Sequence, residues 1–383
     1  MMHVLFLTIG YPTVYNIQSG IFFREQAEAL AVAGMRTGLI AINAVSIKHI
    51  IRKRSFAGLR KREFNTNGVQ TVLTSFINNP VKPDYVVHQA LRKGRGLVSA
   101  YIEQYGKPDL IHLQCFETVE LAQYIKSRWS IPYVVTEHSS RFLLDTLNPG
   151  LEKYAASCFQ NSDKNIAVST NFAELLEKRY QAPFLYIPNM VDTEFFTMLK
   201  RDHVKPNRFI NVGVLDKNKN QALLIEAIAR LRDRGRDLGL VIVGEGPERT
   251  NLQAMIKQRA LENHVKLKGF LGRGALLNEL HDSHAFLLSS QFETFGVALI
   301  EAMSCGLPAV CTRSPGPESI IAKPGLGILC DNDPDDYVLA VDRLIEEYSS
   351  FSPSYIHNYV REYFSKFSVS KKLMDLYKGV IKA

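Results

Sequence analysis

The chain has 383 residues, of which 46% are hydrophobic and 22% charged, and its formal net charge at pH 7 is +8. This composition is typical of a folded globular protein and excludes a disordered or fibrous chain. Because one hydrophobic core rarely covers such a length, we predict two domains of roughly 150–200 residues each.

The first half of the chain alternates apolar strands with helices. We expect strands at residues 3–9, 37–43, 109–114 and 132–138, and helices at residues 20–34 and 119–129. The strands are almost continuously apolar, which indicates a parallel sheet covered by helices on both faces.

A second series of the same kind starts at residue 208, with expected strands at 208–215, 238–246, 264–270, 284–290 and 307–313. The segment between the two series, rich in Pro, Asn and charge, places the domain boundary near residues 195–207. The amphipathic segment 359–381 predicts one terminal helix that bridges back to the first domain. We therefore predict an α/β protein with two facing Rossmann-like doubly wound domains. The first covers residues 1–198 with a helix at about 365–383, and the second covers residues 199–364.

Two carboxylates in the second domain call for an explanation. Glu301 stands inside an otherwise uncharged helical stretch, where a carboxylate is costly unless it is hydrogen-bonded, and Glu293 precedes it by eight residues. The turn between them brings the N–H groups of Phe295, Gly296 and Val297 to a helix N-terminus, which suits a phosphate. Glu301 could then accept hydrogen bonds from a ribose diol. A bond to a neighbouring backbone group would satisfy it equally well.

Lysines follow another strand of the second domain. Lys217 and Lys219 lie in the loop "VLDKNKNQ", at the start of the next helix. Ligands of open parallel sheets bind at the carboxyl ends of the strands, so these cations could offset the two carboxylates beside a bound phosphate. Surface lysines would show the same pattern. Gly244 and Gly246 in "VGEGPER" fit turns as well as ligand contacts.

The motifs taken together resemble glycosyltransferase family 4, whose members are retaining enzymes of the GT-B fold that use nucleotide sugars. The resemblance rests on "ETFGVALIE" (residues 293–301), followed by "AMSCGLPAV" and "PGPESI". Further pieces occur in the same order along the chain: "YPTVYNIQSGIF", "KPDLIHLQ", "IPYVVTEH", "YIPNMVDTEFF", "NVGVLDKNKN", "VGEGPER" and "VKLKGF".

The resemblance implies roles for individual residues. Glu301 would hold the ribose hydroxyls, and the amides of residues 295–297 would meet the diphosphate and the donor sugar. Glu293 and His138 would contact the transferred sugar as the catalytic pair, although no side chain is implied as an undisputed nucleophile or base. Lys219 would neutralise the diphosphate leaving group, and the remaining donor-binding residues would be Gly20, Gly213, Phe270 and Leu271. No metal or other cofactor is expected besides the nucleotide-sugar co-substrate. From its position alone, His138 could also be a buried strand-end histidine bonded to backbone.

Two positions depart from the family pattern. Val214 stands where the family usually has Arg, so one of two expected cations is missing unless Lys217 replaces it, and Met190 stands where Gly is common. The loss at Val214 leaves open a nucleotide-sugar-binding partner protein without turnover. A nicotinamide-dependent dehydrogenase is a poor alternative, because the loop after the first strand lacks GxGxxG.

A basic segment at residues 46–64 borders the acceptor side of the first domain. It places basic residues among apolar ones, namely Arg52, Lys53, Arg54, Arg60, Lys61 and Arg62. This mixture suits an anionic membrane surface or a pyrophosphate-linked lipid, although a solvated face would look similar. Nucleic acid is not expected. We therefore expect a lipid-linked or cell-envelope saccharide as acceptor, with a small soluble acceptor as the alternative.

The cysteines and the hydropathy bear on location. The five scattered cysteines form no CxxC pair, and no stretch approaches the roughly 20 apolar residues of a membrane span. We expect a cytosolic protein that could lie against the inner face of the cell membrane. The sequence does not identify the base, the sugar, the linkage or the oligomeric state.

Overall fold

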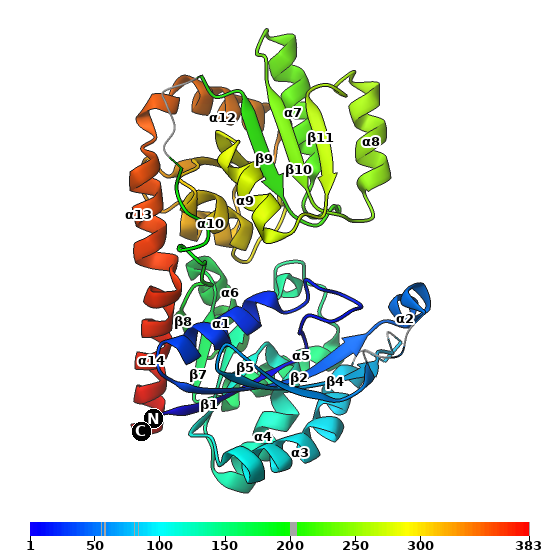
Figure 1. Cartoon of the computed structure of the whole chain (residues 1–383), viewed down its shortest axis with the longest axis vertical. Coiled ribbons are helices and arrows are strands. Elements are labelled where there is room, and N and C mark those ends of the chain that lie inside the picture. Colours follow the sequence, from blue (N-terminus) through cyan, green and yellow to red (C-terminus); the bar gives the residue numbers. More distant parts are fainter. Residues whose placement is uncertain (55, 57–58, 80, 83, 200–204, 383) are drawn as a thin grey trace. The chain divides into compact units, whose positions relative to one another are not determined.

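The structure is a computed structural model that describes residues 1–54, 56, 59–79, 81–82, 84–199 and 205–382 (Figure 1). The chain divides into two compact units, the first formed by residues 1–188 with 369–383 and the second by residues 189–368. Each unit is built on its own mainly parallel sheet. The predicted α/β class with two Rossmann-like domains is therefore confirmed.

The sheet of the first unit has the strand order β3-β4-β2-β1-β5-β6-β7-β8 and is parallel except for the β3–β4 pair. In Figure 1, α1 lies on one face of this sheet, and α3 and α4 lie on the other. The strands are β1 (His3–Thr8), β2 (Arg36–Val45), β3 (Arg62–Thr66), β4 (Val69–Ile77), β5 (Leu110–Gln114), β6 (Tyr133–Glu137), β7 (Lys164–Ala167) and β8 (Phe184–Tyr186). The helices are α1 (Ile21–Val32), α2 (Ile47–Lys53), α3 (Tyr85–Tyr105), α4 (Val119–Trp129), α5 (Pro149–Asn161), α6 (Thr170–Tyr180) and α14 (Lys366–Lys382), with 3-10 turns η2 (Phe116–Thr118) and η3 (Ser140–Phe142).

The antiparallel β3–β4 hairpin was not expected from the sequence. Its two-residue turn is Asn67-Gly68, and both residues have positive φ, 49° and 83°. Asn-Gly is the dipeptide that best fits such a turn, because both of its residues tolerate the left-handed region. The signal was therefore present in the sequence, next to the basic segment.

The sheet of the second unit is entirely parallel, in the order β11-β10-β9-β12-β13-β14, and α7 and α8 flank β9, β10 and β11 (Figure 1). Its strands are β9 (Arg208–Val212), β10 (Gly239–Val243), β11 (Val265–Gly269), β12 (Ala285–Leu288), β13 (Ala309–Thr312) and β14 (Gly327–Cys330). Its helices are α7 (Gln221–Asp233), α8 (Arg249–Gln258), α9 (Arg273–His281), α10 (Val297–Ser304), α11 (Pro315–Ile320), α12 (Pro334–Glu346) and α13 (Pro353–Phe364), with the 3-10 turn η4 (Tyr348–Ser350).

The single terminal helix predicted over residues 359–381 is wrong in one respect, because the structure has two helices there. The backbone is extended at Ser365, between α13 and α14, where it forms an isolated parallel bridge with Val191. The Val191 N–H donates to the carbonyl oxygen of Phe364 at 2.8 Å. Pairing with this strand-like segment interrupts the helical ladder. Beyond the break, α14 joins the first unit, where the Tyr377 hydroxyl lies 2.6 Å from Nδ1 of His112.

Candidate functional site

The carboxyl ends of β9 and β12 are neighbours in the second sheet, and the chain runs outward in opposite directions from this pair. Such a topological switch point leaves room between the two following loops, and it is the usual binding position in open α/β sheets. The loops are residues 213–220 after β9 and residues 289–296 after β12. Four of the nine donor-binding residues predicted from the sequence fall on these two loops, namely Gly213, Lys219, Phe295 and Gly296.

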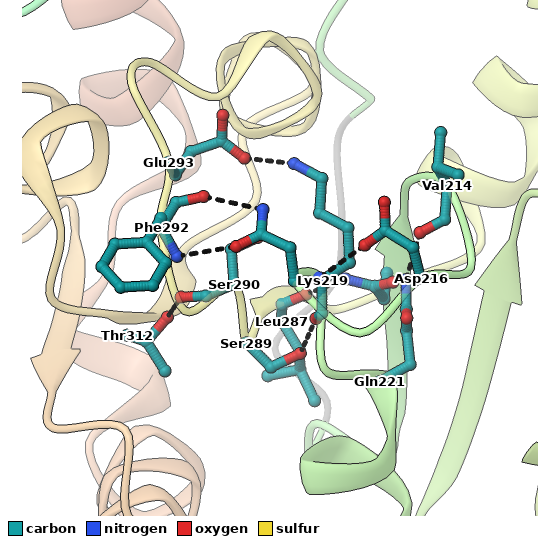
Figure 2. A network of polar contacts seen from close by, with 12 residues as sticks. Val214, Asp216, Lys219, Gln221, Leu287, Ser289, Ser290, Phe292, Glu293 and Thr312 are labelled. Carbon is teal, nitrogen blue, oxygen red and sulfur yellow. Dashed lines mark hydrogen bonds and ion pairs between the residues drawn. The ribbon is translucent and has the colours of Figure 1, made fainter. Parts of the chain in front are cut away.

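Lys219 and Glu293 meet across this switch point. The Nζ atom of Lys219 forms an ion pair with Oε2 of Glu293 (Figure 2). The two side chains are 25% and 14% exposed, so the pair is partly shielded from water and still accessible. The sequence predicted separate roles for these residues, toward the diphosphate and toward the sugar. The structure shows that each already neutralises the other.

Asn218 fastens the two loops together, and the sequence analysis did not single it out. Its side chain donates to the carbonyl oxygen of Phe292 at 3.0 Å and accepts from the Phe292 N–H at 3.1 Å. Ser289 adds a bond from its hydroxyl to the carbonyl oxygen of Lys219, at 2.8 Å (Figure 2). This backbone clamp holds the base of the Lys219 side chain at a fixed position opposite Glu293. An amide-rich strand-end loop, "DKNKNQ", was the only signal available for it.

The N-terminus of α10 opens beside Glu293. Gly296 precedes the helix with φ of 106°, a conformation that favours glycine. The first N–H groups of a helix have no partners within it, so this end of α10 can receive an anion. Phe295 as a whole is buried, and Val297 is half-buried at the first helical position. The predicted contact of residues 295–297 with a phosphate stays a prediction.

Glu301 lies one turn into α10 and is half-buried. It does have an interaction partner within the chain. Both explanations from the sequence therefore remain open for this carboxylate, and its predicted contact with ribose stays a prediction.

The other predicted residues of the second unit lie in loops that follow its strands. Gly213 lies beside the aliphatic part of Lys219, and the Val214 carbonyl oxygen accepts from the Gln221 side chain at 3.0 Å. The Val214 side chain is 46% exposed, and Lys217 is exposed on the same loop. Phe270 and Leu271 follow β11 at the edge of the sheet, and their predicted role toward the base stays a prediction.

His138 directly follows β6 in the first unit. Its Nε2 atom lies 2.9 Å from Oε1 of Gln114, and the rings of Phe22 and Phe23 lie 5.1 and 5.2 Å from its ring. Burial lowers the pKa of His138 to about 3. The ring is therefore neutral at physiological pH, and its Nε2 atom contacts the side-chain amide of Gln114.

A buried carboxyl group supports the loop that carries His138. The Glu137 carboxyl group accepts from the N–H groups of His138 at 2.9 Å, Ser139 at 2.8 Å and Phe116 at 3.3 Å. Burial and the neighbouring Glu117 raise the pKa of Glu137 to about 7. Glu117 in turn forms an ion pair with Arg141.

The local backbone by itself explains why residue 20 is a glycine. It precedes α1 with φ of 64°, and a Cβ atom there would collide with the carbonyl oxygen of Gly10. Its predicted contact with the diphosphate stays a prediction.

The basic segment includes α2 and the first residues of β3. Among the predicted residues Arg54, Arg60, Lys61 and Arg62 are exposed, whereas the side chains of Arg52 and Lys53 lie outside the described residues. Apolar side chains are exposed between them, Ile51 by 68% and Phe56 by 67%.

On its inner side, α2 is anchored by Ile50, which packs against Tyr15 and Val45. Because Tyr15 belongs to the loop after β1, that loop lies next to α2. We define the apolar-basic surface as the exposed residues Val14, Ile17, Ile47, Lys48, Ile51, Arg54, Phe56, Arg60, Lys61 and Arg62. Within the part of the chain that the structure describes, no helix is long and apolar enough to span a bilayer.

Comparison with known families matches most of the chain. The family model described as "Glycosyl transferases group 1" matches residues 197–362, and the model "Glycosyltransferase Family 4" matches residues 54–195. The two matches adjoin at the segment between the units.

Relatives and solved structures agree with this match. The chain is 29% identical to a phosphatidylinositol N-acetylglucosaminyltransferase component of Arabidopsis thaliana, over 65% of this chain and 56% of that protein. It is 30% identical to the N-acetylgalactosamine-N,N'-diacetylbacillosaminyl-diphospho-undecaprenol 4-alpha-N-acetylgalactosaminyltransferase of Campylobacter jejuni, over 53% of this chain and 54% of that protein. The chain thus spans about half the length of these relatives. Anabaena HepE in complex with UDP has a similar fold, with a TM-score of 0.74 at 15% identity over 99% of this chain and 100% of that chain.

Proposed function

Because the chain belongs to glycosyltransferase family 4, we propose that it transfers a sugar from a nucleoside-diphosphate sugar to a lipid-linked or other cell-envelope saccharide. The observation that carries this proposal is the meeting of Lys219, Glu293 and the α10 N-terminus at the switch point of the second sheet. That combination supplies one cation, one carboxylate and a set of backbone donors, which together suit a diphosphate that carries a sugar.

The chemistry follows from how charge moves in the reaction. The bond between the anomeric carbon and the diphosphate oxygen breaks, a bond to the acceptor oxygen forms, and negative charge grows on the diphosphate. In this proposal the Lys219 ammonium and the first N–H groups of α10 stabilise that charge as it develops. In the front-face route the acceptor proton passes to the departing diphosphate oxygen. Retention of the anomeric configuration belongs to the proposal through the family resemblance of residues 293–301.

The lipid-linked acceptor is supported by two observations. The relatives named above are described as acting on phosphatidylinositol and on an undecaprenyl-diphosphate-linked sugar. The apolar-basic surface places exposed Ile51 and Phe56 beside exposed cations, a combination that suits the headgroup region of an anionic bilayer. We accordingly propose that the protein works at the inner face of the cell membrane. A small soluble acceptor would leave this surface without a use.

A nucleotide-sugar-binding partner protein without turnover is the second candidate, and the exposed Val214 side chain is what favours it. With one cation fewer at the diphosphate, the protein could bind the nucleotide sugar without transferring the sugar. A transfer assay run alongside the binding assay separates the two candidates.

The first experiment measures thermal unfolding with UDP, GDP, ADP or CMP for the wild type, Glu301→Ala and Glu301→Gln. A ligand at 100 times its dissociation constant should add about 2.7 kcal/mol to the free energy of unfolding. We expect one diphosphate to stabilise the wild type and both variants to lose that gain. Glu362→Ala, an exposed change on α13, should keep it. If no nucleotide shifts the wild type, the proposed donor site is wrong.

A second experiment measures binding to vesicles of anionic or zwitterionic lipid. Lys48→Gln with Arg60→Gln removes two exposed cations from the apolar-basic surface and should weaken binding to anionic vesicles about thirtyfold, since each basic residue near such a surface contributes about 1 kcal/mol. Lys153→Gln with Lys164→Gln is the matched control, because both lysines are exposed on other elements of the first unit. Equal binding by both double variants would remove the membrane from the proposal.

The proposal includes no metal ion, since Lys219 and the α10 N-terminus offer the counter-charge for the diphosphate. Transfer should therefore proceed at the same rate in EDTA. A rate that EDTA abolishes and magnesium or manganese restores would show that the diphosphate needs a metal ion.

A further inference from the structure

Side chains continue the connection between β9 and β12 beyond the backbone pair that joins Ile210 to Phe286. One residue farther along each strand, the Asn211 side chain donates to the carbonyl oxygen of Leu287 at 2.7 Å. The chain then leaves the two strands in opposite directions, which is what separates their loops at a switch point. Hydrogen bonds from side chains therefore connect the two loops in place of a regular backbone ladder.

Asn218 makes the next connection, between the loops themselves. Its side chain donates to the Phe292 carbonyl oxygen at 3.0 Å and accepts from the Phe292 N–H at 3.1 Å, and its own carbonyl oxygen accepts from the Gln291 N–H at 2.8 Å. A carboxamide holds a donor and an acceptor in one plane, as a peptide group does. Asn218 therefore pairs with Phe292 much as a residue on a neighbouring strand would.

The position of this connection in the chain gives it a further consequence. Asn218 and Phe292 are the residues immediately before Lys219 and Glu293, so the clamp joins the direct neighbours of the ion pair. On the other side of the pair, the Ser289 hydroxyl donates to the Lys219 carbonyl oxygen at 2.8 Å (Figure 2). The backbone from which the Lys219 side chain extends is thus held on the loop that carries Glu293.

The chemistry of lysine makes such support useful. A lysine ammonium sits on a flexible four-carbon stem, so its place depends on where its backbone is held and on what the ammonium contacts. A cation stabilises growing negative charge best when it is already in place, because nothing has to reorganise during the reaction. An error of about 1 Å in such a position can cost on the order of a hundredfold in rate.

We propose that Asn218 is a positioning residue that holds the Lys219 ammonium where the departing diphosphate develops its charge. The role toward the diphosphate rests on the proposed function, whereas the placement of the ammonium against Glu293 does not. The proposal implies that Asn218 acts through Lys219. Once the ammonium is removed, the clamp has no charge left to position.

NMR tests the placement without any nucleotide. In protein labelled with ¹⁵N-lysine, an ammonium group gives a signal when its protons exchange slowly with water, as in a well-held ion pair, and Lys219→Met assigns that signal. We expect the signal in the wild type and its loss in Asn218→Leu. Asn161→Leu is the matched control, because it removes a side-chain bond of the same type, to the Ser157 carbonyl oxygen at 2.8 Å, from the exposed end of α5. No Lys219 signal in the wild type, or an unchanged signal in Asn218→Leu, would overturn the proposal.

Kinetics in two backgrounds test the function of the clamp. Asn218→Leu should lower kcat and kcat/KM about tenfold each and leave the donor KM nearly unchanged, since the lost interaction belongs to the transition state. In a Lys219→Met background, the same change should alter kcat/KM by less than about twofold, because both substitutions then remove one interaction. Equal losses in the two backgrounds, or a raised KM with unchanged kcat, would contradict a role through Lys219.

A second variant covers the case in which Asn218→Leu does not fold. Ser289→Ala removes a different bond of the clamp and should weaken the Lys219 signal and lower kcat in the same way. Failure of the proposed function shows separately, as the absence of both transfer and any nucleotide-induced shift in thermal unfolding. The ammonium signal would still report whether Asn218 positions Lys219.

Discussion

The ammonium group of Lys219 and the carboxylate of Glu293 form an ion pair that bridges the loops after β9 and β12. These residues are 74 positions apart in the chain, and the Asn218 clamp keeps their loops at a fixed separation. If this is the donor site, as proposed, a diphosphate that enters it would compete with Glu293 for Lys219. The pair would then set part of the donor affinity, since the carboxylate repels the same phosphates that the lysine attracts.

The first prediction separates these two effects. Glu293→Gln keeps the shape of the side chain and frees Lys219, so a nucleoside diphosphate should bind about fivefold tighter, as expected for roughly 1 kcal/mol of relieved repulsion. Sugar transfer should nevertheless fall, because Glu293 is proposed to contact the donor sugar. Titration calorimetry measures the first quantity and initial rates the second.

The matched control for that change is Glu226→Gln on α7. The Glu226 side chain is also 14% exposed and also pairs with cations, Arg230 and Arg259. It should leave diphosphate affinity unchanged. Weaker diphosphate binding by Glu293→Gln would show that the carboxylate supports the donor site instead of competing with it.

A second prediction concerns the missing cation. Val214→Arg places a guanidinium group on the exposed end of the loop after β9 and should raise kcat/KM about tenfold, because a preorganised cation stabilises the departing diphosphate. Val214→Leu controls for side-chain bulk. No gain from Val214→Arg, together with a large loss from Lys217→Met, would mean that Lys217 already supplies the second charge.

A third prediction tests the docking of α14 on the first unit. Tyr377→Phe leaves the fully buried Nδ1 of His112 without its partner and should lower the free energy of unfolding by about 1–3 kcal/mol, measured in urea. Tyr154→Phe removes the same type of bond, to His88 at 3.0 Å, from the surface, and should cost less than about 0.5 kcal/mol. Equal costs would contradict the assignment of Tyr377 to a buried network.

A fourth prediction follows from Glu137, whose pKa burial and Glu117 raise from 4.5 to about 7. A raised carboxyl pKa means that the folded state binds the proton more tightly than the unfolded state does. The protonated Glu137 side chain therefore stabilises the folded state fully below pH 4.5, and this stabilisation is lost as the pH rises to 7. Glu137→Gln removes this term. The wild type should therefore lose stability relative to Glu137→Gln across that window, with a slope approaching 1.4 kcal/mol per pH unit, roughly the limit for one proton.

The difference in unfolding free energy between the wild type and Glu137→Gln at the same pH isolates the contribution of Glu137, because the other titrating groups are common to both proteins. His112 and His138, whose pKa values burial lowers, oppose it, because they destabilise the folded state as the pH falls below 6.5. Glu103→Gln, an exposed change on α3, should show no such slope. A flat difference for Glu137→Gln would mean that Glu137 stays ionised in the folded state.

The local patterns of the chain were enough to predict its class. Continuous apolar runs such as β1 and β12 show strands buried on both faces, and the run from Glu293 to Glu301 indicates a loop that opens a helix. These features depend on neighbours within a few residues, so the sequence displays them directly. The β3–β4 hairpin belongs to the same class, since Asn67-Gly68 was a readable signal that went unused.

Other features depend on contacts between distant parts of the chain, and only the tertiary structure decided them. The bridge from Val191 to Ser365 breaks a segment whose apolar periodicity continues through the break. Gln114 reaches His138 because β5 and β6 are neighbouring parallel strands whose ends coincide, and Tyr377 reaches His112 across 265 positions. Lys219 and Glu293 were each identified from the sequence, but their pairing depends on strand order and on the clamp that sets the loop separation. The periodicity of apolar residues in the sequence indicates which residues are buried. The contact partners of each side chain are determined by how the buried surfaces pack together.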